Sequence, residues 1–121
     1  MNVLITLPKR LIDKIIIGEK TLELRSRIPM RYDDNSRIYV VQKGTRRIRL
    51  SFRCPYFNKV QANHESALVY HRFLGISLEE YMSYVSRYRE LCFWPIKDLM
   101  NECATIDDFN IKRNPQSFIY F

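Results

Sequence analysis

The sequence contains little glycine, proline or cysteine. Its 121 residues include 3 Gly, 5 Pro and 3 Cys, whereas 46% are hydrophobic. This composition excludes collagen-like and Gly/Pro-rich disordered chains and is typical of a folded protein. The cysteines Cys54, Cys92 and Cys103 are odd in number and form no CxxC pair. Neither a disulfide framework nor a zinc site is therefore indicated, and we expect buried or half-buried free thiols.

Long hydrophobic runs are also absent. No apolar stretch reaches about 18 residues, the length that spans a bilayer. The N-terminus MNVLITLPKR carries polar residues and a proline where a signal peptide needs an unbroken apolar segment. We therefore expect a cytoplasmic protein with no membrane partner. A chain of this length has room for one ordinary domain, so we expect residues 1–121 to form a single domain.

The histidines give no sign of a metal centre. His64 and His71 have no cysteine or carboxylate at a spacing typical of metal ligands. We expect both to be ordinary surface or half-buried residues, and we expect neither a metal nor a cofactor.

Positive charge is concentrated in one segment. Residues 25–53 contain nine basic and two acidic residues, so their net charge of +7 equals that of the whole chain. A local field of this sign suits a polyphosphate partner, because cations that neutralise phosphates release condensed counterions. The simpler alternative is a solvated basic face without a partner.

Apolar periodicity predicts a strand, a helix and a second strand at the start of the chain. The run VLITL at residues 3–7 is β-branched and aliphatic, and Pro8 suits the first turn of a helix. Helical periodicity continues to Gly18, where a left-handed helix end favours glycine. From Thr21 the period changes to two, which predicts a strand with Glu23 and Arg25 on its polar face.

The remaining segments predict a mixture of strands and helices. Residues 37–53 have the pattern of a β-hairpin turning at KGT. The other expected elements are helices at NHESALVYHRFLG and SLEEYMSYVSRY, strands at ELCFW and SFIYF, and a one-turn helix beginning at Thr105. About six short strands of this kind close their edges most easily as a barrel.

The second arm of the predicted hairpin carries three arginines on one face. Arg47, Arg49 and Arg53 alternate with apolar residues. Like charges at alternate positions repel unless solvent or an anion screens them, so this face is either open to water or suited to a negative partner. Tyr56 and Phe57 follow in a loop, and we expect both rings to be exposed for stacking on unpaired bases.

Residues 18–25, GEKTLELR, resemble the GxKxxExR signature of ASCH domains, members of the PUA-like barrel superfamily. Gly18, Lys20, Glu23 and Arg25 stand at the matching positions. Three longer segments also resemble these domains, namely VLITLPKRLIDKIIIGEK, GISLEEYMSY and DDFNIKRNPQSFIYF. The resemblance implies an α+β fold, a small PUA-like β-barrel of about six strands with an N-terminal helix and a helical insertion.

The resemblance also implies a functional site. It places Lys20, Glu23 and Arg25 in a cleft that faces an RNA or nucleotide ligand, and it makes Ser117, in the closing PQSF, a further candidate catalytic residue. Some relatives degrade RNA. One branch is similar to acetylcytidine amidohydrolases, in which the second threonine of Lys-Thr-x-Thr is the nucleophile. Glu23 stands at that place here, so the corresponding hydroxyl is missing.

The motif residues leave two chemical interpretations open. A glutamate between a lysine and an arginine can act as a general base while the cations hold phosphate oxygens. The simpler alternative is a structural ion-pair network. Lys20 has the opposite strand parity to Glu23, so the three side chains converge only if Lys20 lies before the strand or at a bulge.

We therefore predict a protein that binds RNA or another single-stranded nucleic acid. Hydrolysis of RNA by Lys20, Glu23 and Ser117 is an open extension of this prediction. One alternative is an adaptor or inhibitor whose basic face docks an acidic protein, and another is a hydrolase of a modified nucleoside. The sequence does not define the oligomeric state. The predicted ligand contacts are Lys20, Glu23, Arg25, Arg47, Arg49, Arg53 and Tyr56.

Overall fold

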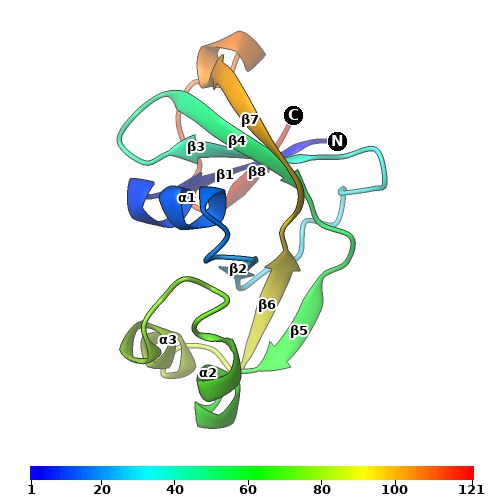
Figure 1. The fold of residues 1–121 in the computed structure, drawn as a ribbon. Coiled ribbons are helices and arrows are strands. Elements are labelled where there is room, and N and C mark those ends of the chain that lie inside the picture. The colour runs from blue at the N-terminus through cyan, green and yellow to red at the C-terminus, as the bar shows by residue number, and fades with distance from the viewer.

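The chain forms two β-sheets and three α-helices, described for all residues 1–121 by a computed structural model (Figure 1). Its fold is therefore of the mixed α+β type. The elements are β1 (Val3–Leu7), α1 (Lys9–Ile16), β2 (Leu22–Arg25), β3 (Ile38–Gln42), β4 (Arg47–Arg53), β5 (Asn58–Gln61), α2 (His64–Tyr70), α3 (Leu78–Val85), β6 (Glu90–Pro95), β7 (Lys97–Thr105), the 3₁₀ helix η1 (Ile106–Phe109) and β8 (Phe118–Tyr120).

The larger sheet has five strands in the order β7-β4-β3-β1-β8, and the smaller has three in the order β2-β6-β5. Strands β1 and β3 are parallel, and every other pair is antiparallel. The chain ends lie together, because Asn2 and Phe121 exchange two backbone hydrogen bonds of 2.8 and 2.9 Å. Figure 1 shows the larger sheet and α1 in the upper half of the molecule, and the smaller sheet below them beside α2 and α3.

The prediction of a closed barrel is wrong. Each sheet keeps two edges, β7 and β8 in the larger one and β2 and β5 in the smaller one. The chain changes sheets next to prolines: Pro95 ends β6 just before β7, and Pro55 lies between β4 and β5. Proline has no N–H to donate to a ladder, and both prolines lie where the chain leaves one sheet for the other.

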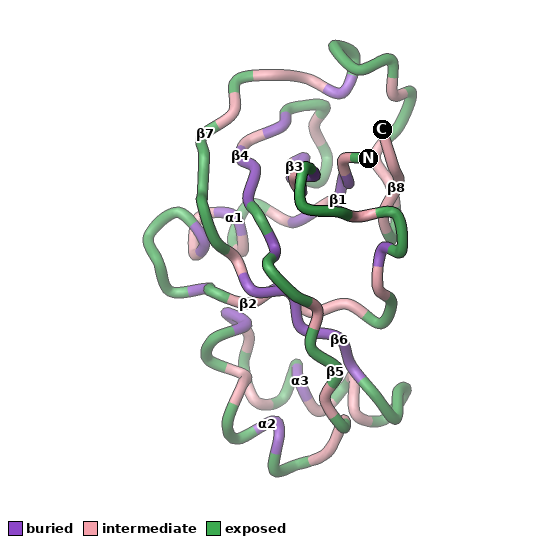
Figure 2. The backbone as a smooth tube through the Cα atoms, turned by 90° about the vertical axis from the view of Figure 1, so that its right-hand side faces the viewer, coloured by how far each residue is buried: buried purple, intermediate pink, exposed green.

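Strand β6 is buried on both faces and joins two hydrophobic clusters. Trp94 belongs to the main core between the sheets, whereas its neighbour Phe93 packs with Ala67, Leu74 and Tyr81 of the helical region. Successive side chains of a strand point to opposite faces, so a continuous apolar strand serves both clusters. Figure 2 shows β6 largely buried and β7 largely exposed.

The local predictions for the first strand, the first helix and the helix that begins after Ser77 are confirmed. The first strand is β1, the first helix is α1, and Gly18 adopts a positive φ of 84°. Ser77 caps α3 by accepting a hydrogen bond from the Glu80 N–H. The expected six strands are too few, because the polar strands β5 and β7 were not predicted. No helix of the structure has the length and apolar character needed to span a bilayer.

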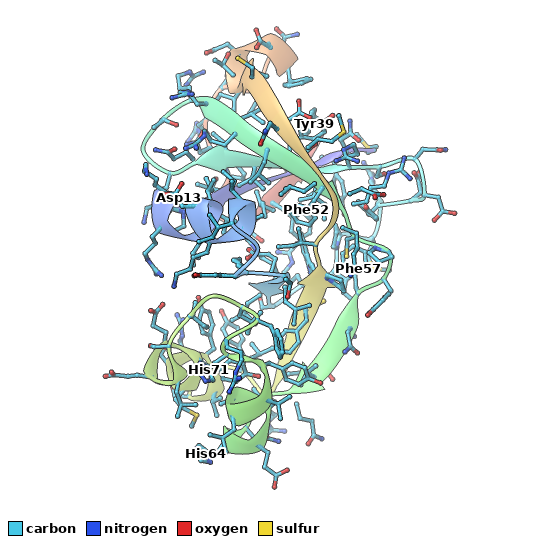
Figure 3. All side chains as sticks on the ribbon, viewed as in Figure 1. Asp13, Tyr39, Phe52, Phe57, His64 and His71 are labelled. Atoms are coloured by element: carbon cyan, nitrogen blue, oxygen red, sulfur yellow. The ribbon has the colours of Figure 1, made fainter.

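The expectation of buried or half-buried cysteines holds for two of the three residues. Cys54 and Cys92 are buried, whereas Cys103 is exposed on β7. Burial raises the pKa of the Cys54 thiol to about 12. His64 is exposed and His71 is half-buried, with its Nδ1 atom 3.1 Å from the Ile76 carbonyl oxygen. Figure 3 shows both histidines in the α2 region.

Candidate functional site

The GEKTLELR segment connects α1 to β2. Lys20 lies before the strand, and its side chain reaches the same carboxylate as Arg25. The conflict of strand parity is thereby removed, because only Glu23 and Arg25 have to share a strand face. The structure therefore brings all three charged motif residues together.

Lys20 is a fully engaged buried cation. Its side chain is 1% exposed, and Nζ lies 3.0 Å from Glu23 Oε1. The same ammonium donates to the carbonyl oxygens of Leu22 at 2.6 Å and Leu74 at 2.8 Å. An ammonium has three N–H donors, so all of them have partners. Burial lowers the Lys20 pKa, although the nearby Glu23 charge opposes this change.

Glu23 is held between two cations. One carboxylate oxygen faces Lys20, and the other accepts a hydrogen bond of 2.6 Å from Arg25 Nε. Burial by itself would raise the Glu23 pKa, but the charges and hydrogen bonds of Lys20 and Arg25 hold this pKa below its ordinary value. Such a carboxylate has a low affinity for protons, so the arrangement favours an orienting role over that of a general base.

Arg25 also forms hydrogen bonds to two other segments of the chain. Its Nη1 donates to the Ser117 carbonyl oxygen at 3.0 Å, and its Nη2 lies 3.4 Å from the Thr6 carbonyl oxygen. The guanidinium also lies over the Trp94 ring, 5.9 Å from its centroid. Since the side chain is 14% exposed, Arg25 both anchors the closing segment and presents part of its surface to solvent.

A cleft of about 450 Å³ opens beside this network. Two helical regions face each other across it: Arg10 of α1 contributes on one side, and Tyr84 of α3 and the following Tyr88 contribute on the other. Arg10 Nη2 lies 3.2 Å from Glu80 Oε2, and this ion pair links α1 to α3. The remaining polar lining comes from β1, from the motif and the residue after it, and from the closing segment, namely Thr6, Lys20, Glu23, Arg25, Ser26, Gln116 and Ser117.

The structure separates the predicted site residues into two groups. Lys20, Glu23, Arg25 and Ser117 all line the cleft. The others do not, namely Arg47, Arg49, Arg53 and Tyr56.

The arginines of β4 have different surroundings. Arg47 is exposed, and Arg53 is exposed with its Nη1 3.4 Å from the Asp34 carbonyl oxygen. Arg49 is half-buried, and its Nη1 donates to Gln42 Oε1 at 2.5 Å. These residues form no common site with the motif.

Only one of the two loop aromatics is available for stacking. Tyr56 is 60% exposed. The prediction of an exposed Phe57 is wrong, because its ring packs edge-on against Tyr32 and Trp94 with centroid distances of 5.4 Å to each. Side chains of adjacent residues in an extended chain point in opposite directions, so one ring faces solvent and the other the core.

The sequence does not predict the part of the cleft that the helical regions supply. Arg10, Tyr84 and Tyr88 line the cleft but are not among the ligand contacts that the sequence predicts. The spacing of four residues between the tyrosines places them on one side of a helix, but no local pattern shows that this side faces α1. The structure groups no three His, Cys, Asp or Glu side chains that could hold a metal ion.

Comparison with solved structures identifies the fold. The crystal structure of ASCH from Zymomonas mobilis has a TM-score of 0.82 at 19% identity and covers 99% of this chain and 87% of that chain. A serine-to-alanine variant of that protein has a TM-score of 0.82 at 18% identity, with the same coverage. A tyrosine-to-phenylalanine variant has a TM-score of 0.81 at 18% identity and covers 99% of this chain and 89% of that chain. No protein-family model and no curated protein matches the sequence. The chain therefore has an ASCH-domain fold.

Proposed function

We propose that the cleft binds a nucleotide of single-stranded RNA. The observation that carries this proposal is the combination of two guanidinium groups and two tyrosines around one cavity, Arg10 and Arg25 with Tyr84 and Tyr88. Guanidinium groups bind phosphate oxygens in pairs of hydrogen bonds, and aromatic rings stack on unpaired bases. The cleft volume of about 450 Å³ is within the usual range for small-ligand sites.

The motif residues act in this proposal by positioning. Glu23 fixes the Arg25 guanidinium through the hydrogen bond to Nε. Lys20 balances the buried Glu23 charge and ties the Leu74 carbonyl of the helical region to β2. Prior fixation of a guanidinium lowers the entropy lost when a phosphate binds. Arg10 is the more exposed cation and supplies an adaptable contact.

The hairpin arginines act at longer range. Arg47, Arg49 and Arg53 lie outside the cleft but belong to the segment that carries the net positive charge of the chain. A charged surface next to a site raises the rate of encounter with an anionic ligand, and salt screens this effect. We assign these residues to attraction of the strand, and we place Tyr56 as a stacking contact for bases outside the cleft.

Hydrolysis of the bound RNA is a second candidate function. Ser117 lines the same cleft as Arg25, and its hydroxyl makes no hydrogen bond within the chain. A free hydroxyl in the same cleft as a guanidinium combines a potential nucleophile with a group that stabilises negative charge. Binding is the better supported function, because no base lies in hydrogen-bond contact with that hydroxyl.

The proposal is tested with a labelled single-stranded RNA in a salt series. Binding that weakens with increasing salt and is lost in the Tyr84→Ala, Tyr88→Ala variant supports a nucleotide site in the cleft. Fragmentation of the RNA that disappears in Ser117→Ala would add hydrolysis. Indifference to RNA, together with salt-sensitive binding to a folded acidic protein, would replace the proposal by the adaptor alternative. Turnover of a free modified nucleoside without RNA binding would replace it by the nucleoside hydrolase alternative.

A further inference from the structure

The loop before β8, residues 110–117, is fixed through its carbonyl groups. Arg46 Nη1 donates to the Lys112 carbonyl oxygen at 3.0 Å, and Thr6 Oγ1 donates to the Pro115 carbonyl oxygen at 2.7 Å. The Ser117 carbonyl oxygen accepts from Arg25 at 3.0 Å. The negative ends of these peptide groups are therefore directed at donors on the body of the protein.

The amide groups of the same loop have no such partners. The backbone N–H groups of Lys112, Arg113, Asn114, Gln116 and Ser117 make no hydrogen bond within the chain. A group of free backbone N–H donors on a loop with anchored carbonyls creates a local positive potential, which is the basis of many phosphate-binding loops. The loop thus offers donors for an anion without any rearrangement of its hydrogen bonds.

A second hollow lies over this loop. It has a volume of about 500 Å³ and is lined mainly by residues 110–116, including Lys112 and Arg113. Both of these cations are exposed, and neither forms an ion pair. The nearby carboxylate of Asp107 is engaged, because Arg46 donates to its two oxygens at 2.9 and 2.5 Å. The hollow is accordingly positive, with no free carboxylate on its lining.

The two hollows are neighbours. Gln116 lines both the cleft and the hollow, and Ser117, the next residue, lines the cleft. A strand that leaves the cleft along this segment would therefore bring its next phosphate over the loop.

We infer that the loop of residues 112–117 binds a backbone phosphate of the nucleic-acid strand whose nucleotide occupies the cleft. The inference rests on the proposed function and extends it from one nucleotide to a strand with a defined path. Lys112 and Arg113 supply the charge, and the free N–H groups supply directed hydrogen bonds. The path runs from the cleft over Gln116, not along the arginine face of β4.

The test compares uridine 5′-monophosphate with a uridine pentanucleotide, since only the second extends beyond the cleft. In the Lys112→Gln, Arg113→Gln variant we expect weaker binding of the pentanucleotide, with its salt slope reduced by about 1. The affinity for the mononucleotide should stay within about twofold of the wild type, as expected for a phosphate contact outside the cleft. The matched control is Arg72→Gln, Arg89→Gln, which removes the same charge from exposed residues that line neither hollow.

Amide chemical shifts test the backbone part of the inference. In ¹⁵N-labelled wild-type protein, the pentanucleotide should shift the amide signals of residues 112–117 more than the mononucleotide does. Equal losses of affinity in the two double variants, or unchanged loop amides with the pentanucleotide bound, would overturn the loop site while leaving the cleft intact. A wild-type protein that binds neither ligand would overturn the cleft and the loop together.

Discussion

The Glu23 carboxylate accepts a hydrogen bond of 2.6 Å from Arg25 Nε, on one face of a four-residue strand. Arg25 in turn reaches the Ser117 carbonyl, almost at the other end of the chain. A charge pair within one short strand thus fixes the position of the closing segment. This is why we regard the motif primarily as the frame of the cleft and only secondarily as a source of reacting groups.

Replacement of this carboxylate should destabilise the fold in a pH-dependent way. In Glu23→Gln, the buried Lys20 loses its counter-charge, and removal of one partner of a buried pair costs about 3 to 5 kcal/mol. The folded-state pKa of Glu23 lies below its ordinary value of 4.5, so the unfolded chain takes up this proton first as the pH falls. The wild-type advantage should therefore be complete at pH 7 and should shrink below about pH 4.5.

Urea unfolding at several pH values measures this difference. Glu19→Gln is the matched control, because Glu19 is exposed and forms no ion pair, and its effect should be small at every pH. A wild-type advantage over Glu23→Gln that is as large at pH 3 as at pH 7 would contradict the assignment of a charged, paired Glu23.

Gly75 should be sensitive to a single added methyl group. Its φ is 71°, and a Cβ built there would lie 3.1 Å from Lys20 Cβ and 3.3 Å from Lys14 Cδ. Gly44 has a similar φ of 79° but open space at the same position. Alanine at a positive φ costs about 1 kcal/mol. Gly44→Ala should lose this amount, and Gly75→Ala should lose about 1 to 3 kcal/mol more because it also crowds the buried lysine.

Urea unfolding measures the loss of stability in each alanine variant. Because the backbone strain is common to both, the difference between the two losses gives the cost of crowding Lys20 and Lys14. Equal losses of stability would show that the loop around Gly75 moves without disturbing Lys20, contrary to a rigid connection between β2 and the helical region.

Release of Arg10 should strengthen RNA binding. Its partner Glu80 is 45% exposed, and an exposed ion pair of this kind contributes at most about 1 kcal/mol. A phosphate in the cleft would have to compete with Glu80 for the guanidinium. Glu80→Gln should therefore raise the affinity for a short RNA by about two- to fivefold, the equivalent of that pair energy.

Glu79→Gln provides the control for this measurement. Glu79 lies in the same first turn of α3, is exposed and forms no ion pair, so both variants lose one charge at the same helix end. If the two variants bind RNA equally, Arg10 does not contact the ligand and the gain is a general charge effect.

The sequence predicts the parts of the fold that depend on local patterns. Apolar period and turn residues place β1, α1 and β2, because the side chains that define each element are its own neighbours. Strand β7 is not predicted from the sequence because it lacks the alternation of apolar and polar residues that marks a half-buried strand. It is exposed along most of its length, and its apolar residues Leu99 and Met100 face solvent. The position of β7 is determined by its pairing with β4, and this pairing cannot be predicted from the residues of β7 alone.

The candidate site was predictable in part for the same reason. The motif places Lys20, Glu23 and Arg25 within eight residues, and their convergence follows once Lys20 lies outside the strand. Tyr84 reaches the cleft only because α3 packs opposite α1, a contact between segments about 70 residues apart. The positive charge of the β4 arginines favoured them as ligand contacts. However, β4 is an interior strand of the larger sheet, whereas the motif strand β2 belongs to the smaller sheet.

A nucleotide site in the cleft is tested most simply by comparing variants of the cleft with variants of the basic hairpin, residues 37–53. Binding of a labelled uridine pentanucleotide is measured by fluorescence anisotropy at two salt concentrations, for Arg10→Gln, Tyr88→Ala and for Arg47→Gln, Arg53→Gln. All four residues have exposed side chains, so both variants should fold. We expect the cleft variant to lose affinity at both salt concentrations, because stacking is not screened, and the hairpin variant to lose less affinity and only at low salt. A cleft variant that binds like the wild type, beside a hairpin variant that no longer binds, would contradict a nucleotide site in the cleft.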